Sequence, residues 1–453
     1  MTPETGTPAT GNPATGNPAT HLSQVRGPTQ QTPGRSRFSS RGLPSRSQLA
    51  VVSFLFLLFA HVGLRTWRAS DDAANDFATY YEASLDVREG RDPYRTKDNL
   101  SPYIYPPFLI WALTPITYIP YRAAALIWAL VSILSLILLT SLSARAALAG
   151  PEKQAGPPWP GWPPIVIPFL ICLRFGLREL TQGQVNGVVT LLTLLALTAL
   201  LRDRDLLAGF LLGLGGSIKY LPVGFGLPLL AWKKWRALGG LVLGVAAGLL
   251  LPILGYGPTG WSQVQGQWVG SELFHHATSL GMDTHMTNQS LWAALMRFLT
   301  PISTQTVFHE AHFVHVMNLS PETVTRIHLL VVAFLVAVAF FALVRSGPRP
   351  DRMATGWALT WILAHLISKK TWEEHLVTLI LVLAVLHSQI RSRIGLFIIG
   401  ITLWCHTPLF VGRERSDIIQ GYSPVTLGLV IAFFLLVRGL LARPGSASSP
   451  EVS

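Results

Sequence analysis

Long apolar segments, repeated along most of the chain, limit what this sequence can fold into more than any other feature. The longest of them run for about 17 to 22 residues, the length at which an α-helix crosses a hydrocarbon layer roughly 30 Å thick. Half of the 453 residues are hydrophobic and only 13% are charged, a balance that soluble domains of this length do not show. Because backbone hydrogen bonds inside a bilayer must be satisfied within the chain, the sequence predicts an all-α polytopic membrane protein.

The basic residues follow the pattern of a membrane protein. The net charge is +12, yet the lysines and arginines fall mainly in short clusters between apolar segments, which is the positive-inside pattern. We therefore expect membrane lipids as partners and no nucleic acid. The alternation of these clusters predicts about twelve spans and a cytoplasmic C-terminus; Lys369-Lys370 is an exception, because it falls on the outer side. Cys172 and Cys405 lie inside apolar segments and indicate neither a disulfide framework nor a thiolate metal site.

Composition divides the chain into three parts. The first is rich in Pro, Gly, Thr and Ser, contains the repeat GNPATGNPAT and cannot bury a core, so we expect a disordered cytoplasmic tail. Leu49 to Val62 is similar to a signal-peptide core, but Arg65 and Arg68 stand where a cleavage site is expected, which favours an uncleaved first span. The expected boundaries are residues 1–47 for this tail, 48–441 for the membrane domain with external loops at 67–105 and 257–324, and 442–453 for a second disordered cytoplasmic tail.

Several apolar segments are too short or too interrupted for an ordinary span. Pro107 to Ile119 is bounded by prolines and predicts a short re-entrant or interfacial helix, and Leu291 to Leu299 predicts a marginal helix in an external loop. Leu206 to Ile218 and Tyr220 to Trp232 meet at Lys219, which predicts a broken hairpin with that lysine at its tip. The other expected spans are Leu126–Leu142, Ile165–Leu180, Val188–Leu201, Leu238–Gly255, Ile327–Val344, Trp357–Ile367, Leu376–Leu386, Ile394–Trp404 and Val425–Val437.

The polar stretch from Asn75 to Pro107 follows the first span and lies on the predicted outer side. Asp76 is the candidate functional acid in this stretch. Its alternative role is a helix N-cap beside Asn75, a common use of Asn and Asp residues. Asp71 and Asp72, just before it, suit a solvated loop end.

Three basic residues lie within apolar surroundings. Lys219 interrupts a long apolar run, where a charge is costly unless it is paired or lines a wet cavity. It either contacts a phosphate or extends its charge to the membrane surface. Arg174 and Arg178 are one helical turn apart and share a face. They either bind a phosphate or pair with acids in the membrane.

Other polar and aromatic residues have two possible roles each. Gln184 and Asn186, in the turn Gln182 to Asn186, either hydrogen-bond a polar ligand or cap the following helix. Tyr94 and Trp372 either stack on a ligand or belong to the aromatic belt at the membrane surface.

Histidines occur at two positions of interest. His375 follows Glu373-Glu374 and either supports a catalytic base or belongs to a polar helix end. Three further histidines follow one another at intervals of three residues, a spacing that invites a metal site. Because they do not form an H-E-x-x-H motif, we expect a solvated histidine-rich face and no metal. These three are His309, His312 and His315.

Short motifs follow one another along roughly residues 50 to 440. They are Asp76-Phe77 with Tyr80-Tyr81, Gly90 to Tyr94, Tyr105-Pro106-Pro107, Gly183 to Asn186, Ile218 to Pro222, Asn288 to Leu291 with Arg297, and Trp372 to His375. In this order they resemble the polyprenol-phosphate-dependent mannosyltransferases of glycosyltransferase family 87, membrane enzymes of the GT-C fold. Where members of that family often carry paired histidines after the late tryptophan, this chain has Glu373-Glu374-His375.

The resemblance implies a GT-C-like helical bundle and an inverting transfer of a hexose, expected to be mannose. The sugar would move from a polyprenyl-phosphate-linked donor to a lipid or glycan acceptor on the extracytoplasmic face of a bacterial plasma membrane, without a nucleotide sugar, cofactor or metal. A carboxylate must take the proton of the attacking hydroxyl, and cations must hold the leaving phosphate. The implied catalytic residues are Asp76 and His375, and the implied substrate-binding residues are Lys219, Arg178, Gln184, Asn186, Tyr94, Trp372 and Asn288.

One alternative function is a transporter or flippase for a lipid-linked sugar. Broken helices with a buried lysine also suit a translocation path. A purely structural membrane scaffold is a weaker alternative, because charged residues within membrane segments are costly and usually functional.

Overall fold

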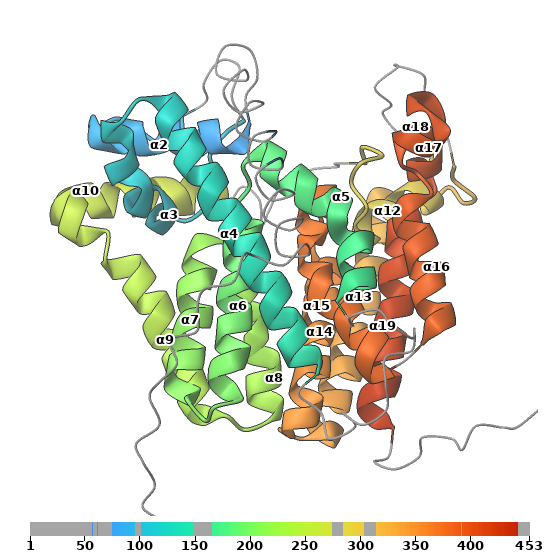
Figure 1. Ribbon diagram of the computed structural model, residues 1–453. Coiled ribbons are helices and arrows are strands. Elements are labelled where there is room, and N and C mark those ends of the chain that lie inside the picture. The colour runs from blue at the N-terminus through green and yellow to red at the C-terminus, as the bar shows by residue number, and fades with distance from the viewer. Residues whose placement is uncertain are drawn as a thin grey trace, which may run out of the picture. The chain divides into compact units, whose positions relative to one another are not determined.

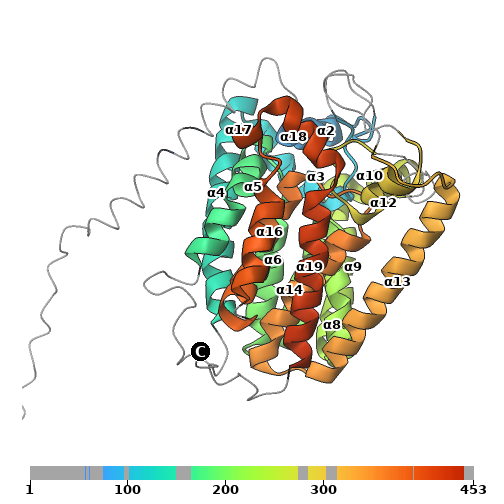
Figure 2. The ribbon, with the colours of Figure 1, turned by 90° about the vertical axis from the view of Figure 1, so that its right-hand side faces the viewer.

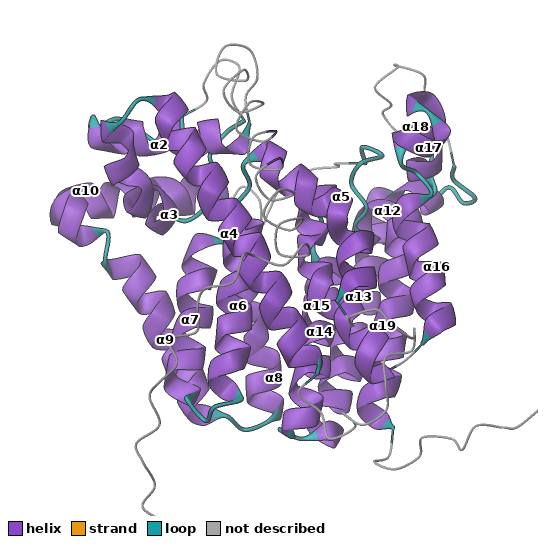
Figure 3. Cartoon of the chain, in the orientation of Figure 1, coloured by secondary structure: helices purple, strands orange, loops and turns teal. Residues whose placement is uncertain are grey.

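The computed structural model describes Leu57, His61 and residues 75–95, 101–148, 165–273, 284–302, 314–390 and 392–442. Within these ranges the chain consists of helices and connecting loops, with no strand (Figure 3). The expected first span, Leu49 to Val62, lies outside the described residues except for Leu57 and His61, as do the tail 1–47 and nearly all of the tail 442–453.

Helices joined by loops and by single helical turns make up the described chain. The α-helices are α2 (Asp76–Arg88), α3 (Pro107–Leu113), α4 (Tyr121–Ala147), α5 (Val166–Gln182), α6 (Asn186–Leu200), α7 (Asp205–Ile218), α8 (Gly226–Ala231), α9 (Trp235–Leu250), α10 (Ile253–Gln267), α12 (Leu291–Leu299), α13 (Pro321–Ser346), α14 (Pro350–Ile367), α15 (Leu379–Val385), α16 (Arg393–Trp404), α17 (Pro408–Val411), α18 (Arg413–Gly421) and α19 (Pro424–Leu441). Short 3₁₀-helical segments are η1 (Thr114–Tyr118), η2 (Leu221–Phe225) and η4 (Glu373–Thr378). Short π-helical segments are η3 (Trp268–Leu273) and η5 (Leu386–Ile390).

Among the described residues, four helical segments are long and apolar enough to cross a membrane. They are Tyr121–Ala147, Pro321–Ser346, Glu373–Ile390 and Pro424–Leu441. The bent pair α9 and α10 is a further candidate, and shorter apolar helices accompany these segments. The predicted class, an all-α polytopic membrane protein, is confirmed.

The short and interrupted helices agree with the sequence in most places. The predicted helix Leu291 to Leu299 is α12, and α7 and η2–α8 form the predicted broken hairpin, with Lys219 at the C-cap of α7. The segment Pro107–Tyr118 is a short apolar helix, as predicted.

One predicted span is wrong in its outer part. Leu238 to Gly255 was expected as one helix, but α9 ends at Leu250 and α10 leaves it at an angle of 81°. The physical reason is Pro252, which has no backbone N–H with which to continue the hydrogen-bond ladder of α9. Helix α10 therefore begins in what was expected to be the end of a span.

The short helices gather at one end of the bundle. In both Figure 1 and Figure 2, helices α2, α3, α10, α12, α17 and α18 lie at the upper end, and α8 lies toward the opposite end. Every expected catalytic residue belongs to a segment that begins or ends at this upper end. We call it the outer end, after the side of the membrane predicted for Asn75 to Pro107.

Helices α7 and α9 pack backbone against backbone through glycines. A Cβ built on Gly209 would lie 1.7 Å from the Ala237 carbonyl oxygen, and one on Gly240 would lie 2.2 Å from the Leu206 carbonyl oxygen. Such an approach is possible only where both helices lack side chains. It fixes the position of α7 and therefore of Lys219 at its C-terminal end.

This packing predicts a large difference between two neighbouring glycines of α9. Gly240→Ala should lower the free energy of unfolding by about 1 to 3 kcal/mol, because the backbones must move apart. Gly239→Ala is the matched control: its Cβ would meet nothing within 4 Å, and alanine forms helix better than glycine by about 1 kcal/mol. Thermal unfolding in detergent compares the two, and equal losses would contradict the packing described.

Candidate active site

Asp76 is the first residue of α2, and Asn75 caps that helix. The Asn75 carboxamide oxygen accepts a hydrogen bond from the Ala78 backbone N–H at 2.9 Å. The alternative role of Asp76 as N-cap is therefore wrong, because its neighbour holds that position. The Asp76 side chain is half-buried, and its Oδ2 accepts a hydrogen bond from Gln184 Nε2 at 2.7 Å. The Tyr80 hydroxyl in turn donates to Gln184 Oε1 at 3.2 Å.

The turn between α5 and α6 brings Gln184 to this carboxylate. Gly183 ends α5 in the left-handed conformation, with φ of 65°, and its carbonyl accepts a hydrogen bond from Trp128 Nε1 at 2.8 Å. A Cβ on Gly183 would lie 2.7 Å from Phe77 Cβ. Glycine is required here both for the backbone conformation and for the contact with α2. The turn therefore presents its next residue directly to Asp76.

Asn186 joins a buried acid to a buried cation. Its Nδ2 donates to Glu179 Oε2 at 2.9 Å, and its Oδ1 accepts from Lys219 Nζ at 2.7 Å. The Gly187 backbone N–H donates to the other Glu179 oxygen at 2.6 Å. The Lys219 side chain is buried, at 5% exposure. Its charge is therefore held by polar partners inside the protein and is not extended to the membrane surface.

His375 and Tyr105 complete the surroundings of Lys219. The Lys219 Nζ lies 3.3 Å from His375 Nε2 and 5.3 Å from the centre of the Tyr105 ring. His375 belongs to η4, and the Trp372 backbone N–H donates to its Nδ1 at 3.4 Å. The Trp372 indole stacks nearly parallel to the imidazole at 6.5 Å and is 40% exposed. Part of the Trp372 ring is therefore exposed at the protein surface, close to His375.

The two arginines on one face of α5 differ in their surroundings. Arg174 is bonded to Glu373 and Thr407, and its Nη2 lies 2.9 Å from His406 Nε2. Arg178 lies 3.9 Å from Glu374, beyond hydrogen-bond distance, and its side chain is 53% exposed. The acid-pairing role therefore fits Arg174, whereas Arg178 keeps access to a ligand.

Tyr94 and Asn288 use their polar atoms inside the protein. The buried Tyr94 donates its hydroxyl hydrogen to the Tyr105 carbonyl at 2.9 Å. The Asn288 Oδ1 accepts from the Thr371 backbone N–H at 3.0 Å, and its Nδ2 donates to the Lys369 carbonyl at 2.9 Å. Both residues therefore hold neighbours of the cluster in place, and their role in binding a substrate stays a prediction.

Opposing influences act on the pKa of Asp76. Burial raises the pKa of this carboxyl above its usual value, while the hydrogen bond from Gln184 and the positive charges of Lys219 and Arg178 act to lower it. Desolvation is the larger influence, because water cannot fully surround the charged form. A carboxyl whose pKa is raised in this way is a better proton acceptor once it is ionised.

Sequence reasoning gave no role to three residues that contact this cluster: Glu179, Tyr105 and His406. A signal was present for Glu179, since an acid in an apolar segment must be paired. Of the three evenly spaced histidines, only His315 lies among the described residues. In that part of the chain, no group of three metal-ligating side chains is close enough to hold a metal ion.

The contacts of Arg174 predict a stability effect. Glu373→Ala removes the carboxylate that bonds Arg174 and lies 3.1 Å from the buried His406. We expect a loss of about 2 kcal/mol in unfolding free energy, since a mostly buried cation loses its partner. Glu414→Ala, which removes an exposed acid from α18, should change stability by less than about 1 kcal/mol. Thermal unfolding in detergent measures both, and a Glu373 variant as stable as the control would contradict the assignment.

Two curated relatives are similar to the chain over most of its length. Each is named a polyprenol-phosphate-mannose-dependent alpha-(1-2)-phosphatidylinositol pentamannoside mannosyltransferase. The protein from Mycolicibacterium smegmatis is 25% identical over 68% of this chain and 66% of its own length. The protein from Mycobacterium tuberculosis is 26% identical over 82% of this chain and 80% of its own length.

Two solved structures of ArnT from Cupriavidus metallidurans also align with the chain. The one bound to undecaprenyl phosphate is 15% identical with a TM-score of 0.37, and the apo one is 14% identical with a TM-score of 0.39. Both alignments cover 86% of this chain and 78% of the solved chain. Likeness at this level carries no inference about the site.

The family model gives a firmer result than these alignments. The model described as glycosyltransferase family 87 matches residues 103–368, more than half of the 453 residues. This is the family that the order of motifs resembles, and the matched range includes Gln184, Asn186 and Lys219. The chain belongs to glycosyltransferase family 87.

Proposed function

We propose that this protein is an inverting mannosyltransferase that moves mannose from a polyprenyl-phosphate donor to a lipid or glycan acceptor. Family membership supports sugar transfer, and the names of both relatives support the donor. The observation that carries the proposal is the set of contacts joining Asp76, Gln184, Asn186, Lys219 and His375, which come from segments far apart in the sequence. A proton acceptor and a phosphate-binding cation are the two groups that this transfer requires.

Asp76 acts as the general base in a single displacement. The acceptor hydroxyl oxygen forms a bond to the anomeric carbon while the bond from that carbon to the phosphate oxygen breaks. The hydroxyl proton passes to Asp76, and the electron pair of the broken bond leaves with the polyprenyl phosphate. Gln184 fixes the carboxylate through Oδ2. Attack from the side opposite the leaving group inverts the configuration of the anomeric carbon.

The cations stabilise the phosphate as its negative charge grows. Lys219 is held in a fixed place by Asn186, so it needs no reorganisation during the reaction. Arg178, exposed and only loosely paired, can turn toward the phosphate with its planar donors. His375 orients the acceptor beside Lys219, and the exposed face of Trp372 stacks on a sugar ring.

The site lies on the extracytoplasmic side of a bacterial plasma membrane in this proposal. Basic clusters such as Lys233-Lys234 follow α8, which lies toward the end opposite α2 in Figures 1 and 2. Positive charges are concentrated on the cytoplasmic side of membrane proteins. The proposed membrane domain is residues 48–441, with a cytoplasmic tail on either side.

Replacement of the base tests the mechanism. In Asp76→Asn, mannose transfer should fall by about 10²- to 10⁴-fold, because the acceptor proton has no base. Donor binding should stay within about twofold, since the carboxylate is not a phosphate ligand. The assay uses purified protein in nanodiscs, labelled polyprenyl-phosphate-mannose and phosphatidylinositol pentamannoside, the acceptor in the relatives' names. Comparison of donor and product by NMR checks the inversion.

Glu82→Gln, on the same helix, is the matched control and should keep wild-type transfer. Wild-type turnover in Asp76→Asn would overturn the role of the base. A folded wild-type protein that labels no acceptor, yet carries the donor across a liposome membrane, would favour the transporter alternative.

The pH dependence of transfer follows from the surroundings of Asp76. The base works only when ionised, so kcat/KM should fall as pH drops through its pKa, at a pH above the usual aspartate value of about 3.9. The hydrogen bond from Gln184 lowers this pKa, so Gln184→Leu should move the acid limb to higher pH. Gln265→Leu, which removes a bond to the Leu249 carbonyl on another helix, should leave the limb in place. An acid limb of kcat/KM that stays at the same pH, or moves to lower pH, in Gln184→Leu would contradict the assignment.

A further inference from the structure

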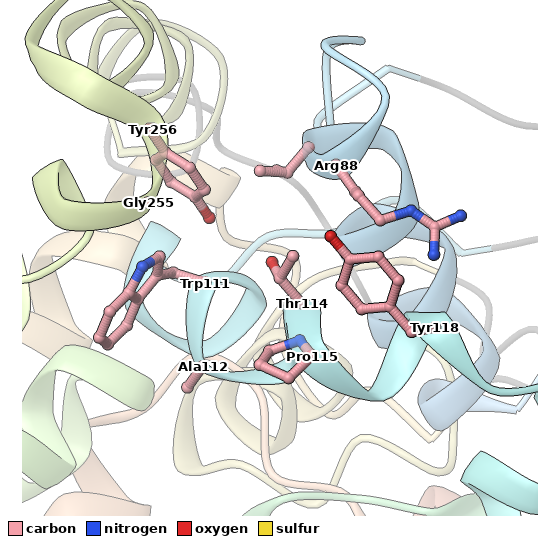
Figure 4. A pocket seen from close by; sticks show the side chains of 9 residues that line it. Arg88, Trp111, Ala112, Thr114, Pro115, Tyr118, Gly255 and Tyr256 are labelled. Atoms are coloured by element: carbon pink, nitrogen blue, oxygen red, sulfur yellow. The ribbon is translucent and has the colours of Figure 1, made fainter.

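A hollow lies at the outer end, outside the cluster around Asp76. It is a cavity of about 640 Å³ between the C-terminal end of α2, the α3–η1 segment and the start of α10. Figure 4 shows its lining, of which the argument uses Arg88, Trp111, Thr114, Tyr118 and Tyr256. We propose that this cavity binds the negatively charged, phosphate-bearing headgroup of a membrane lipid.

Chain connectivity sets this cavity at the level of lipid headgroups. Tyr118 ends η1 three residues before Tyr121, where the membrane-crossing helix α4 begins. Tyr256 follows the outer end of α9, just after the chain has turned by 81°. Two independent segments thus reach the cavity directly from the end of a membrane helix. Tyr118 is 74% exposed, as expected for an aromatic side chain in the interfacial belt.

Arg88 is the basic residue among those that line the cavity, and in Figure 4 its guanidinium lies beside Tyr118 at the edge away from Trp111 and Tyr256. Its guanidinium lies 4.9 Å from the centre of the Tyr118 ring and donates to the Thr117 carbonyl. The nearby acid Glu89 lies 3.7 Å away and is shared with Arg91. The Arg88 side chain remains 27% exposed, and none of the described residues that line the cavity is acidic. A planar guanidinium with donors to spare matches a phosphate group in both geometry and charge.

The rest of the lining suits a polar headgroup with apolar edges. In Figure 4 the Tyr256 hydroxyl and the Thr114 hydroxyl point toward the space between α10 and η1. Trp111 forms one wall and packs on α10, where a Cβ on Gly255 would lie 2.7 Å from the indole nitrogen. The volume lies within the range of roughly 300 to 1,000 Å³ found for small-molecule sites.

Lipid retention tests this proposal without any need for turnover. The purified protein is exchanged into mixed micelles containing equal amounts of phosphatidylglycerol and phosphatidylcholine, and the retained lipid is counted by native mass spectrometry. The wild type should retain phosphatidylglycerol preferentially, and Arg88→Gln should lower that preference about tenfold, the effect of one charge-assisted contact. Tyr118→Leu, a change at an exposed position, should lower it in the same direction. Arg326→Gln, an exposed arginine on α13, should leave it unchanged.

A second readout identifies the source of the headgroup and rests on the proposed transferase activity. If the headgroup belongs to the acceptor, Arg88→Gln should raise KM for the acceptor with kcat and donor binding unchanged. If it belongs to bulk phospholipid, KM should stay the same, while phosphatidylglycerol should no longer raise the melting temperature of the variant. Wild-type retention of phosphatidylglycerol by both Arg88→Gln and Tyr118→Leu would overturn the site, whatever the outcome for mannose transfer.

Discussion

The need to hold the charge of Lys219 inside a membrane protein organises the site. An isolated ammonium away from water is costly, and the cost falls only if polar partners are fixed around it. Asn186 supplies the bond at 2.7 Å, and buried Glu179 fixes Asn186 from the other side at 2.9 Å. This chain of contacts ties α5, α6 and the end of α7 together. Because η4 meets the same lysine through His375, the histidine also takes its place from this constraint.

Asp76 is attached to this framework in a different way. Helix α7 is fixed by glycine contacts with α9, where backbones touch. Helix α2, in contrast, meets the α5–α6 turn through the Gln184 hydrogen bond, and it meets α4 through Phe77, whose ring stacks on Trp128 at 5.5 Å. The proposed base is thus held by side chains and the proposed phosphate ligand by backbone packing. An acceptor near Asp76 and a donor near Lys219 would therefore contact two parts of one site that are held in place in different ways.

Local patterns in the sequence predicted the helices better than the roles of single residues. The lengths of the apolar segments were enough to predict α12 and the hairpin at Lys219, because both depend only on residues close together in the sequence. The bend after α9 was not predicted, because it depends on one proline within an apolar run. The partners of Arg174 could not be predicted, since His406 lies 232 positions away in the sequence. The internal bonds of Tyr94 and Asn288 likewise exist only after the chain has folded, and their role at the substrate stays a prediction.

Arg174 and Arg178 show how the fold can separate two residues that the sequence cannot distinguish. They share a face of α5, and each faces one acid of the pair Glu373-Glu374. Arg174 is 12% exposed and already bonded to Glu373 and Thr407, so an anion that took it would have to break both contacts. Arg178 makes no hydrogen bond to Glu374 at 3.9 Å, so its donors can bind a phosphate without breaking one. Of the two arginines, it is therefore Arg178 that we propose as a phosphate ligand, while Arg174 contacts η4 through Glu373.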